Sequence, residues 1–185
     1  MFFRGKQQGY YIDIGANDGV SGSTTYWCEQ LGWQGICVEP LPSMFEVLKK
    51  HRKCTLINAA ISDKKQESAG FIEFPDRETR SGLADTYDST AYEQNLELSR
   101  AVSIKVPTIA FGDLDAPTHI DFLSIDTEGH EFPIIQGIDF GIHTFDLITI
   151  ETKDALVIDI LKQNGYCILF KLGEDIMFVN ERLWQ

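Results

Sequence analysis

Apolar runs alternate with helical stretches along this chain of 185 residues, and this alternation limits the fold more than any other feature. Runs rich in β-branched residues predict strands at 10–14, 35–38, 55–57, 120–125, 145–150, 166–170 and 176–179. Helices are predicted between them, at 24–31, 43–51 and 154–163. Several strands are apolar throughout, as strands buried on both faces of a sheet should be. The order predicts an α/β fold with helices on both faces of a mostly parallel sheet.

The last two predicted strands form an exception to the parallel pattern. They are joined by the short segment KLGED at 171–175, which is too short for a parallel crossover and therefore predicts a hairpin. We expect a three-layer sandwich whose seven-stranded sheet is mostly parallel, with one antiparallel strand in the C-terminal hairpin.

Composition and charge exclude several classes of protein. Hydrophobic residues make up 43% and charged residues 24% of the chain, which predicts a soluble single domain over 1–185. The net charge of −12 argues against a nucleic-acid partner and against an anionic membrane surface. No apolar run is long enough to span a membrane and the N-terminus is too short for a signal peptide, so we expect a cytoplasmic protein. The four cysteines lack metal-site spacing, which predicts reduced thiols.

The region 63–114 interrupts the alternation of strands and helices. AGFIEF at 69–74 is compatible with a strand, but the polar segment that follows has little periodicity. A long stretch of this kind is typical of a lid or substrate-facing insertion, here expected around 71–104, or of a surface loop. Within it, Phe74, Tyr87 and Tyr92 could stack on a sugar or could belong to the core.

The first predicted strand leads into a loop typical of nucleotide-like ligands, YYIDIGANDGVSG at 10–22. Its glycines do not follow GxGxxG, because Asn17 and Asp18 occupy the interval that a dinucleotide loop keeps small. Asp18, together with Asp13 before the turn, would repel a phosphate. S-adenosylmethionine (SAM) carries a ribose, an ammonium and a sulfonium but no phosphate, so it suits this loop better.

The ends of the next two strands extend the predicted cofactor site. Glu39 ends the second strand beside the first, where an acid can accept both ribose hydroxyls, although it could also be a solvated carboxylate. The position and the following Pro40 favour the binding role. After the third strand, the small Ala59 leaves room for a flat base. Asn58 or Asp63 could hydrogen-bond the edge of that base, or could be ordinary turn residues.

A second cluster of titratable residues lies in DFLSIDTEGHEF at 121–132. Asp126 ends a buried strand, and Glu128, His130 and Glu131 follow within five residues, at the edge where open α/β sheets bind ligands. Such groups should have coupled and partly raised pKa values. His130 is the natural general base near neutral pH, but it could instead cap a helix or pair with a carboxylate. Glu131 could be a first-turn acid that the helix dipole favours.

Glu151 ends the strand that should lie beside the one ending at Asp126. Two carboxylates on adjacent strand ends can bind Mg²⁺, or they can orient a hydroxyl without a metal. The metal-free interpretation is favoured, because the sequence shows no third carboxylate nearby.

Taken in order, YIDIGANDGVSG, CVEPLP, LINAAISD, DFLSIDTEGHE and the IE at 150–151 resemble the FkbM-type family of SAM-dependent methyltransferases over about 10–166. DFLSIDTEGHE is the most specific of these motifs. The resemblance implies a class I methyltransferase (Rossmann-like) fold and methyl transfer to a hydroxyl oxygen of a small molecule or sugar. It places chemistry at Asp126, Glu128 and His130. The residues expected to bind SAM are Asp13, Gly15, Ala16, Asn17, Asp18, Gly19, Glu39, Pro40, Asn58, Ala59 and Asp126.

The expected mechanism is in-line displacement at the sulfonium methyl, with His130 or a carboxylate removing the proton of the acceptor hydroxyl. Two other functions stay open. A SAM-binding module without catalysis would fit the short segment before the first strand. An NAD-dependent oxidoreductase would need the GxGxxG motif, and the acids of the first loop count against it.

Overall fold

A seven-stranded sheet forms the centre of the computed structural model, which describes residues 3, 5–75, 80–86 and 101–183. In space the strands follow the order β10-β11-β9-β8-β1-β2-β3. They are β1 (Tyr10–Ile14), β2 (Gln34–Val38), β3 (Thr55–Ile57), β8 (His119–Ile125), β9 (Thr144–Glu151), β10 (Tyr166–Leu172) and β11 (Asp175–Asn180). Strand β11 is antiparallel to both of its neighbours, and the other pairs are parallel. The prediction of a mostly parallel sheet with one reversed strand in a C-terminal hairpin is confirmed.

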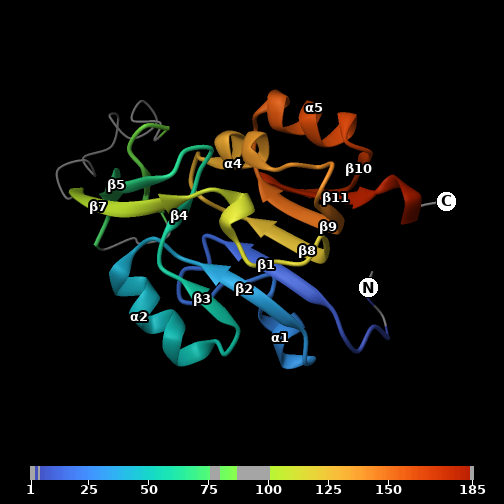
Figure 1. Ribbon diagram of the computed structural model, residues 1–185, viewed down its shortest axis with the longest axis horizontal. Coiled ribbons are helices and arrows are strands. Elements are labelled where there is room, and N and C mark those ends of the chain that lie inside the picture. Colours follow the sequence, from blue (N-terminus) through green and yellow to red (C-terminus); the bar gives the residue numbers. More distant parts are fainter. Residues whose placement is uncertain (1–2, 4, 76–79, 87–100, 184–185) are drawn as a thin grey trace.

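Helices cover both faces of this sheet (Figure 1). Helices α1 (Tyr26–Gln30) and α2 (Pro42–His51) lie on one face, and α4 (Glu131–Gly137) and α5 (Ala155–Gln163) lie on the other. Two short 3₁₀ turns are η3 (Phe111–Asp113) and η4 (Glu181–Leu183).

Alternation along β1 shows how the two faces are filled. Tyr11 packs with the α1–α2 side of the core, whereas Ile12 and Ile14 pack with the α4–α5 side. Asp13 points to the same side as Tyr11 and is only 5% exposed, so it is a buried carboxylate on an otherwise apolar strand. A buried charge requires compensating partners, and those of Asp13 belong to the site described below.

A second, four-stranded sheet occupies much of the region that lacked a clear pattern. Its order is β4-β7-β5-β6. Figure 1 shows this sheet beyond the carboxyl ends of the central strands. Its inward side chains, Phe71, Leu83 and Val106, form a small core with Leu41. The strands are β4 (Ala60–Ile61), β5 (Gln66–Glu73), β6 (Gly82–Leu83) and β7 (Val102–Ile109).

Strand β7 was not predicted, because Pro107 interrupts its sequence and proline cannot donate to a strand ladder. In the structure the pairing of β7 with β5 shifts register between Gln66 and Ala69, opposite Pro107, so a bulge accommodates the proline. Phe74 is buried, which matches the core interpretation of this residue. Tyr87 and Tyr92 lie outside the described residues, as does most of the polar segment that was interpreted as a lid or a loop.

The four cysteines form no disulfide, and Cys28 and Cys37 are buried while Cys54 and Cys167 are half-buried. No helix of the described residues is both long and apolar enough to cross a membrane.

Candidate active site

A pocket opens at the carboxyl ends of β1, β2 and β8, and the second sheet closes one side of it through Phe71 and Leu83. Its empty volume is about 940 Å³, part of which is open to solvent. Most of the predicted site residues line it: Asp13, Gly15, Ala16, Asn17, Glu39, Pro40, Ala59, Asp126, Glu128 and His130. Asp18, Gly19 and Asn58 are not among the lining residues.

The loop after β1 passes very close to the end of β8, and only glycine permits this approach. Gly15 has a φ of +84°, and a Cβ atom there would lie 1.8 Å from the main-chain oxygen of Asp126. The amides of Gly15 and Ala16 both donate to the carbonyl of Val38 at 3.0 Å. The loop is thereby fixed to both neighbouring strands, which holds its main chain against the pocket.

The three predicted residues outside the lining stabilise the main chain around the pocket. The carboxylate of Asp18 accepts from the amides of Val20 and Ser21 at 2.8 and 2.7 Å, which closes a tight turn. Gly19 packs against α2. The side-chain amide of Asn58 donates to the carbonyls of Glu39 and Pro40 at 2.8 and 3.1 Å, so it braces the main chain instead of facing a ligand.

Asp13 and the loop are held by Arg52, a residue that no sequence pattern indicated. Its guanidinium donates to Glu29 at 2.7 Å, to the carbonyl of Gly19 at 2.8 Å and to the hydroxyl of Thr25 at 2.9 Å. Thr25 in turn donates to Asp13 at 2.5 Å. Arg52 is 3% exposed although it belongs to the run KKHRK, whose composition is typical of a solvated helix end. Burial raises the pKa of Asp13, and these hydroxyl and guanidinium partners oppose the rise.

Glu39 lies at the end of β2 as predicted, and it is 5% exposed. Its two carboxylate oxygens accept from the amides of Asn17 and Leu41, both at 2.8 Å. Burial raises the pKa of Glu39 to about 7, although the two amides favour the charged form. A carboxylate offers about four acceptor positions, so acceptor capacity remains on the pocket side.

Three carboxylates meet where β8 and β9 end. The sequence analysis linked Asp126 with Glu128 and, separately, with Glu151, but it did not predict that all three lie together. Oxygen atoms of Asp126, Glu128 and Glu151 lie within 4.8 Å of one another. Glu128 joins the other two because its φ of +56° turns the chain back toward the strand ends. Oxygen ligands in this arrangement suit a hard cation or a positively charged organic group.

The crowding of negative charge changes the acidity of this cluster. Asp126 is exposed at the mouth of the pocket, but desolvation by the surrounding protein, and then the neighbouring Glu151, raise its pKa to about 8. Burial and the same neighbour raise the pKa of Glu128 to about 7. Both groups therefore titrate near neutral pH, where a carboxylate can act as a proton acceptor.

His130 reaches the pocket from the residue before α4, and both of its ring nitrogens have partners. Nδ1 lies 2.7 Å from the hydroxyl of Thr86, and Nε2 lies 3.0 Å from the hydroxyl of Ser62. The ring is 5% exposed, and burial lowers its pKa, so the imidazole is neutral at pH 7. One nitrogen then donates and the other accepts, and the ring joins α4 to the loops that follow β4 and β6.

Glu131 begins α4, and its carboxylate is directed to the preceding turn. It accepts from the amide and the hydroxyl of Thr127 at 3.0 and 2.8 Å, and from the amide of Gly129 at 3.2 Å. These contacts match the interpretation of Glu131 as a first-turn acid of the helix.

A second cavity adjoins the pocket and shares Glu128 with it. Its empty volume is about 1000 Å³, including space open to solvent. It is lined by Thr86, Glu128, Gly129, Glu131, Phe132, Glu151, Thr152, Lys153, Asp154 and Glu174. Because Glu128 and Glu151 face it, a molecule bound there would reach the carboxylate cluster from the side opposite the loop after β1.

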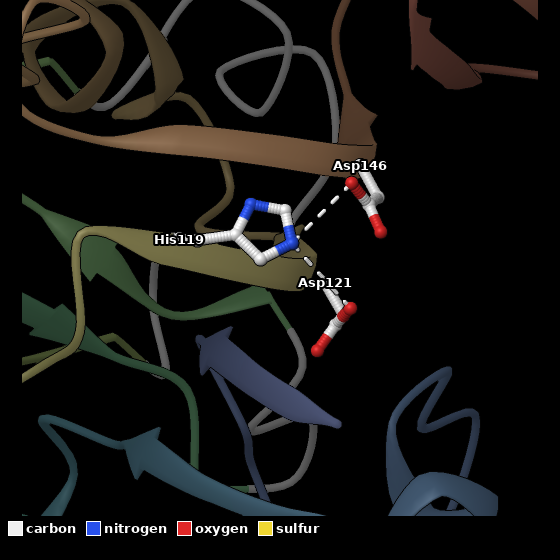
Figure 2. A group of neighbouring side chains, drawn as sticks. All are labelled: His119, Asp121 and Asp146. Carbon is white, nitrogen blue, oxygen red and sulfur yellow. Dashed lines mark ion pairs between the residues drawn. The ribbon is translucent and has the colours of Figure 1, made fainter. Parts of the chain in front are cut away.

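Another group of side chains of the metal-binding type lies at the opposite ends of the central strands, where β8 and β9 begin (Figure 2). The Nε2 atom of His119 lies 3.7 Å from Asp121 and 3.5 Å from Asp146. The ammonium of Lys6 contacts Asp121 and lies 3.6 Å from Asp146. Lys6 supplies the positive charge of this group, so we interpret it as an ion-pair cluster that holds the segment before β1.

Comparisons with known proteins connect this pocket to a family. The model of the methyltransferase FkbM domain matches residues 13–168. This range includes the loop after β1, Glu39 and the carboxylate cluster. No curated protein matches the chain in sequence.

One solved structure shows the same fold, and a second gives a weaker alignment. The crystal structure of methyltransferase FkbM from Methylobacillus flagellatus KT aligns with a TM-score of 0.59 at 12% identity, covering 94% of this chain and 44% of that one. A precorrin-6y C5,15-methyltransferase from Geobacter metallireducens GS-15 aligns with a TM-score of 0.46 at 15% identity, over 94% of this chain and 78% of that one. The present chain thus spans less than half of the Methylobacillus protein. The first likeness confirms the predicted class I methyltransferase fold.

Proposed function

Because the chain belongs to the FkbM methyltransferase family, we propose that it transfers a methyl group from SAM to a hydroxyl oxygen of a small molecule or sugar. One observation of this structure supports the proposal independently of the family membership. The described lining of the pocket contains the carboxylates of Asp13, Glu39, Asp126 and Glu128 but no lysine or arginine. Such a pocket suits a ligand that carries positive charge and hydroxyls, and it opposes a pyrophosphate, so it does not favour an NAD-dependent oxidoreductase.

The donor set suggests how SAM would lie. Glu39 has acceptor capacity for the ribose hydroxyls at the end of β2, and the small side chain of Ala59 leaves space for the adenine. The sulfonium end would then lie toward Asp126, at the end of β8. When bound, SAM supplies a methyl group activated by the adjacent positive sulfur.

The carboxylate cluster is our candidate for the proton acceptor. Glu128 faces both the cofactor pocket and the second cavity, and its pKa of about 7 suits a general base at neutral pH. The neutral ring of His130 has the right charge for a base. However, the hydroxyls of Thr86 and Ser62 occupy both of its nitrogens, so we assign His130 a positioning role and not that of the base. Holding the acceptor oxygen in line with the methyl group can supply roughly 7 kcal/mol or more of the rate enhancement.

The second cavity is our candidate for the acceptor site. Its carboxylates accept hydrogen bonds, so they favour an acceptor rich in hydroxyls, such as a sugar, and disfavour an anionic one. We also propose that the insertion around 71–104 faces the acceptor, since its residue Thr86 lines the second cavity. The four free thiols suit a reducing compartment such as the cytoplasm.

Calorimetry with SAM, followed by conversion of SAM to S-adenosylhomocysteine with a panel of sugars and other alcohols, tests the function. We expect micromolar binding and turnover with at least one hydroxyl acceptor. Glu128→Gln should still bind SAM, with reduced affinity because one carboxylate beside the sulfonium is lost, and it should lose turnover by about 10²-fold or more, the order expected for a general base. Glu174→Gln is the matched control, because Glu174 lines the same cavity but pairs with Lys153.

The possible outcomes separate the functions. Binding of SAM without turnover on any acceptor would favour a SAM-binding module without catalysis. Absence of SAM binding together with binding of NAD would overturn the proposal.

A further inference from the structure

Two cysteine thiols lie in contact at the edge of the central sheet, away from the cofactor pocket. The sulfur atoms of Cys37 and Cys54 are 3.4 Å apart. Cys37 lies in β2, and Cys54 precedes β3 in the turn that follows α2. Because Cys37 pairs with Leu56 across the two strands, Cys54 lies two residues from that pair and on the same face.

The two thiols differ in their access to solvent. Cys37 is fully buried, whereas Cys54 is half-buried and lines a surface groove beside Tyr10, His51 and Thr55. A small oxidant can therefore reach Cys54 first, and it can reach Cys37 only through Cys54.

The surroundings also make Cys54 the better nucleophile. The contact with Cys37 lowers the pKa of the Cys54 thiol, and the nearby Arg52 guanidinium acts in the same direction. The same contact, together with burial, raises the pKa of Cys37. A thiolate is the reactive form of cysteine, so the exposed member of the pair is also the activated member.

We propose that Cys54 is an oxidation site for hydroperoxides and that Cys37 is its resolving thiol. The Cys54 thiolate attacks one oxygen of hydrogen peroxide, the O–O bond breaks, and the products are a Cys54 sulfenic acid and hydroxide. The sulfur of Cys37 then displaces the hydroxyl group from Cys54, and a Cys37–Cys54 disulfide and water form. In total, two thiols lose two electrons and two protons, and one peroxide is reduced to two waters.

The geometry allows the second step with a small displacement. A disulfide bond is about 2.05 Å long, so the sulfurs must approach by roughly 1.4 Å from their present separation. Cys54 lies in a turn and not within a strand, so its main chain can move without breaking a ladder hydrogen bond. The bond would connect the end of α2 to β2, and this site does not depend on the proposed methyl transfer.

Peptide mapping of the full chain after treatment with hydrogen peroxide tests the proposal. Free thiols are blocked with N-ethylmaleimide before digestion. We expect a cross-linked peptide pair joining Cys37 and Cys54, which dithiothreitol reverses, while Cys28 and Cys167 remain alkylated. Cys167 is the matched control, because it is half-buried like Cys54, and Cys167→Ser should leave the cross-link unchanged.

Single variants separate the two roles. Cys37→Ser, or Cys37→Ala if the serine does not fold, should let a Cys54 sulfenic acid accumulate that dimedone traps. Cys54→Ser should leave Cys37 unmodified. Oxidation of Cys54 no faster than that of Cys167, or absence of the Cys37–Cys54 peptide pair from the oxidised wild-type chain, would overturn the proposal.

Discussion

The guanidinium of Arg52 donates a hydrogen bond of 2.8 Å to the main-chain carbonyl of Gly19, and it thereby connects the end of α2 to the loop after β1. The same group pairs with Glu29 and contacts the hydroxyl of Thr25. Arg52 also lies 5.3 Å from the centre of the Tyr11 ring, so the cation is enclosed by acceptors and by an aromatic face. Removal of such a cation leaves buried acceptors without compensation.

We therefore expect Arg52→Met to lower the free energy of unfolding by about 3–5 kcal/mol, the cost of breaking a buried pair by removing one partner. Urea unfolding followed by circular dichroism measures the loss. Lys53→Met is the control, because Lys53 is exposed and its variant should stay within about 0.5 kcal/mol of the wild type. Equal losses for the two variants would show that the Arg52 network contributes little.

Two glycines of the same loop distinguish the two reasons why a position requires glycine, which are close packing and a left-handed backbone conformation. Gly15 and Gly22 both have positive φ, +84° and +72°, but a Cβ at Gly15 meets the Asp126 carbonyl at 1.8 Å and one at Gly22 meets nothing within 4 Å. Gly22→Ala should cost about 1–2 kcal/mol of stability from the left-handed conformation alone. Gly15→Ala should cost more and should abolish SAM binding, because the loop must move away from β8. Calorimetry and thermal unfolding of both variants check this, and retained SAM affinity in Gly15→Ala would contradict it.

The central sheet could be predicted because its strands are buried on both faces. Runs such as those at 120–125 and 145–150 are almost entirely apolar, which is typical of buried strands. The structure places β8 and β9 over them within one residue at each end. The second sheet could not be predicted in the same way. Strand β7 alternates exposed and buried residues and contains Pro107, and its stability comes from pairing with β4 and β5, which are distant in the sequence.

The candidate site was predicted where a residue's role follows from its place at a strand end. Asp13 is the penultimate residue of β1, and Glu39 and Asp126 directly follow β2 and β8, so the topology alone brings them to one pocket. Arg52 was placed by tertiary geometry that no local pattern encodes. Glu128 was predicted beside Asp126, but its approach to Glu151 was not. For Glu128 the determining feature is a left-handed φ of +56°, which sequence patterns do not reveal for a glutamate.

The ion-pair cluster around Lys6 should stabilise the fold without affecting the pocket at the other edge of the sheet. Burial opposes ionisation of Asp121, but hydrogen bonds from Lys6 and the Tyr10 amide outweigh it and lower the pKa of Asp121. This stabilisation is therefore present above the unfolded pKa, near 4, and is lost as the pH falls below it. Lys6→Met should lower stability by about 1 kcal/mol at pH 7, because Lys6 is partly exposed and its charge is screened.

Chemical unfolding at pH 7 and near pH 3 measures this effect, and SAM affinity should not change. The control is Lys153→Met, which removes an exposed ion pair with Glu174 and should have no measurable effect on stability. A difference between wild type and Lys6→Met that persists unchanged near pH 3 would contradict the assignment to Asp121.

Asp126 should weaken the fold at neutral pH. Its pKa is about 8 in the folded protein and near 4 in the unfolded chain, so the folded state binds more protons between these values. Protonation of Asp126 in the folded state stabilises the protein fully below about pH 4, and this stabilisation is lost as the pH rises toward 8. Asp126→Asn lacks this loss, so its melting temperature should exceed that of the wild type at pH 8 and converge with it near pH 4. Thermal unfolding across this range checks the trend, with Asp159→Asn on the exposed side of α5 as a control that should show no such convergence.

Binding of SAM should release protons if the sulfonium lies beside Asp126 and Glu128. A fixed positive charge lowers the pKa of nearby carboxyl groups, and these two groups are partly protonated at pH 7 because their pKa values are about 8 and 7. Affinity for SAM should therefore rise from pH 6 to pH 8 and level off above that range. Calorimetry in buffers of different ionisation enthalpy measures the protons released, and Asp126→Asn should release fewer. An affinity independent of pH, with no proton release, would place the sulfonium away from this cluster even if SAM binds in the pocket.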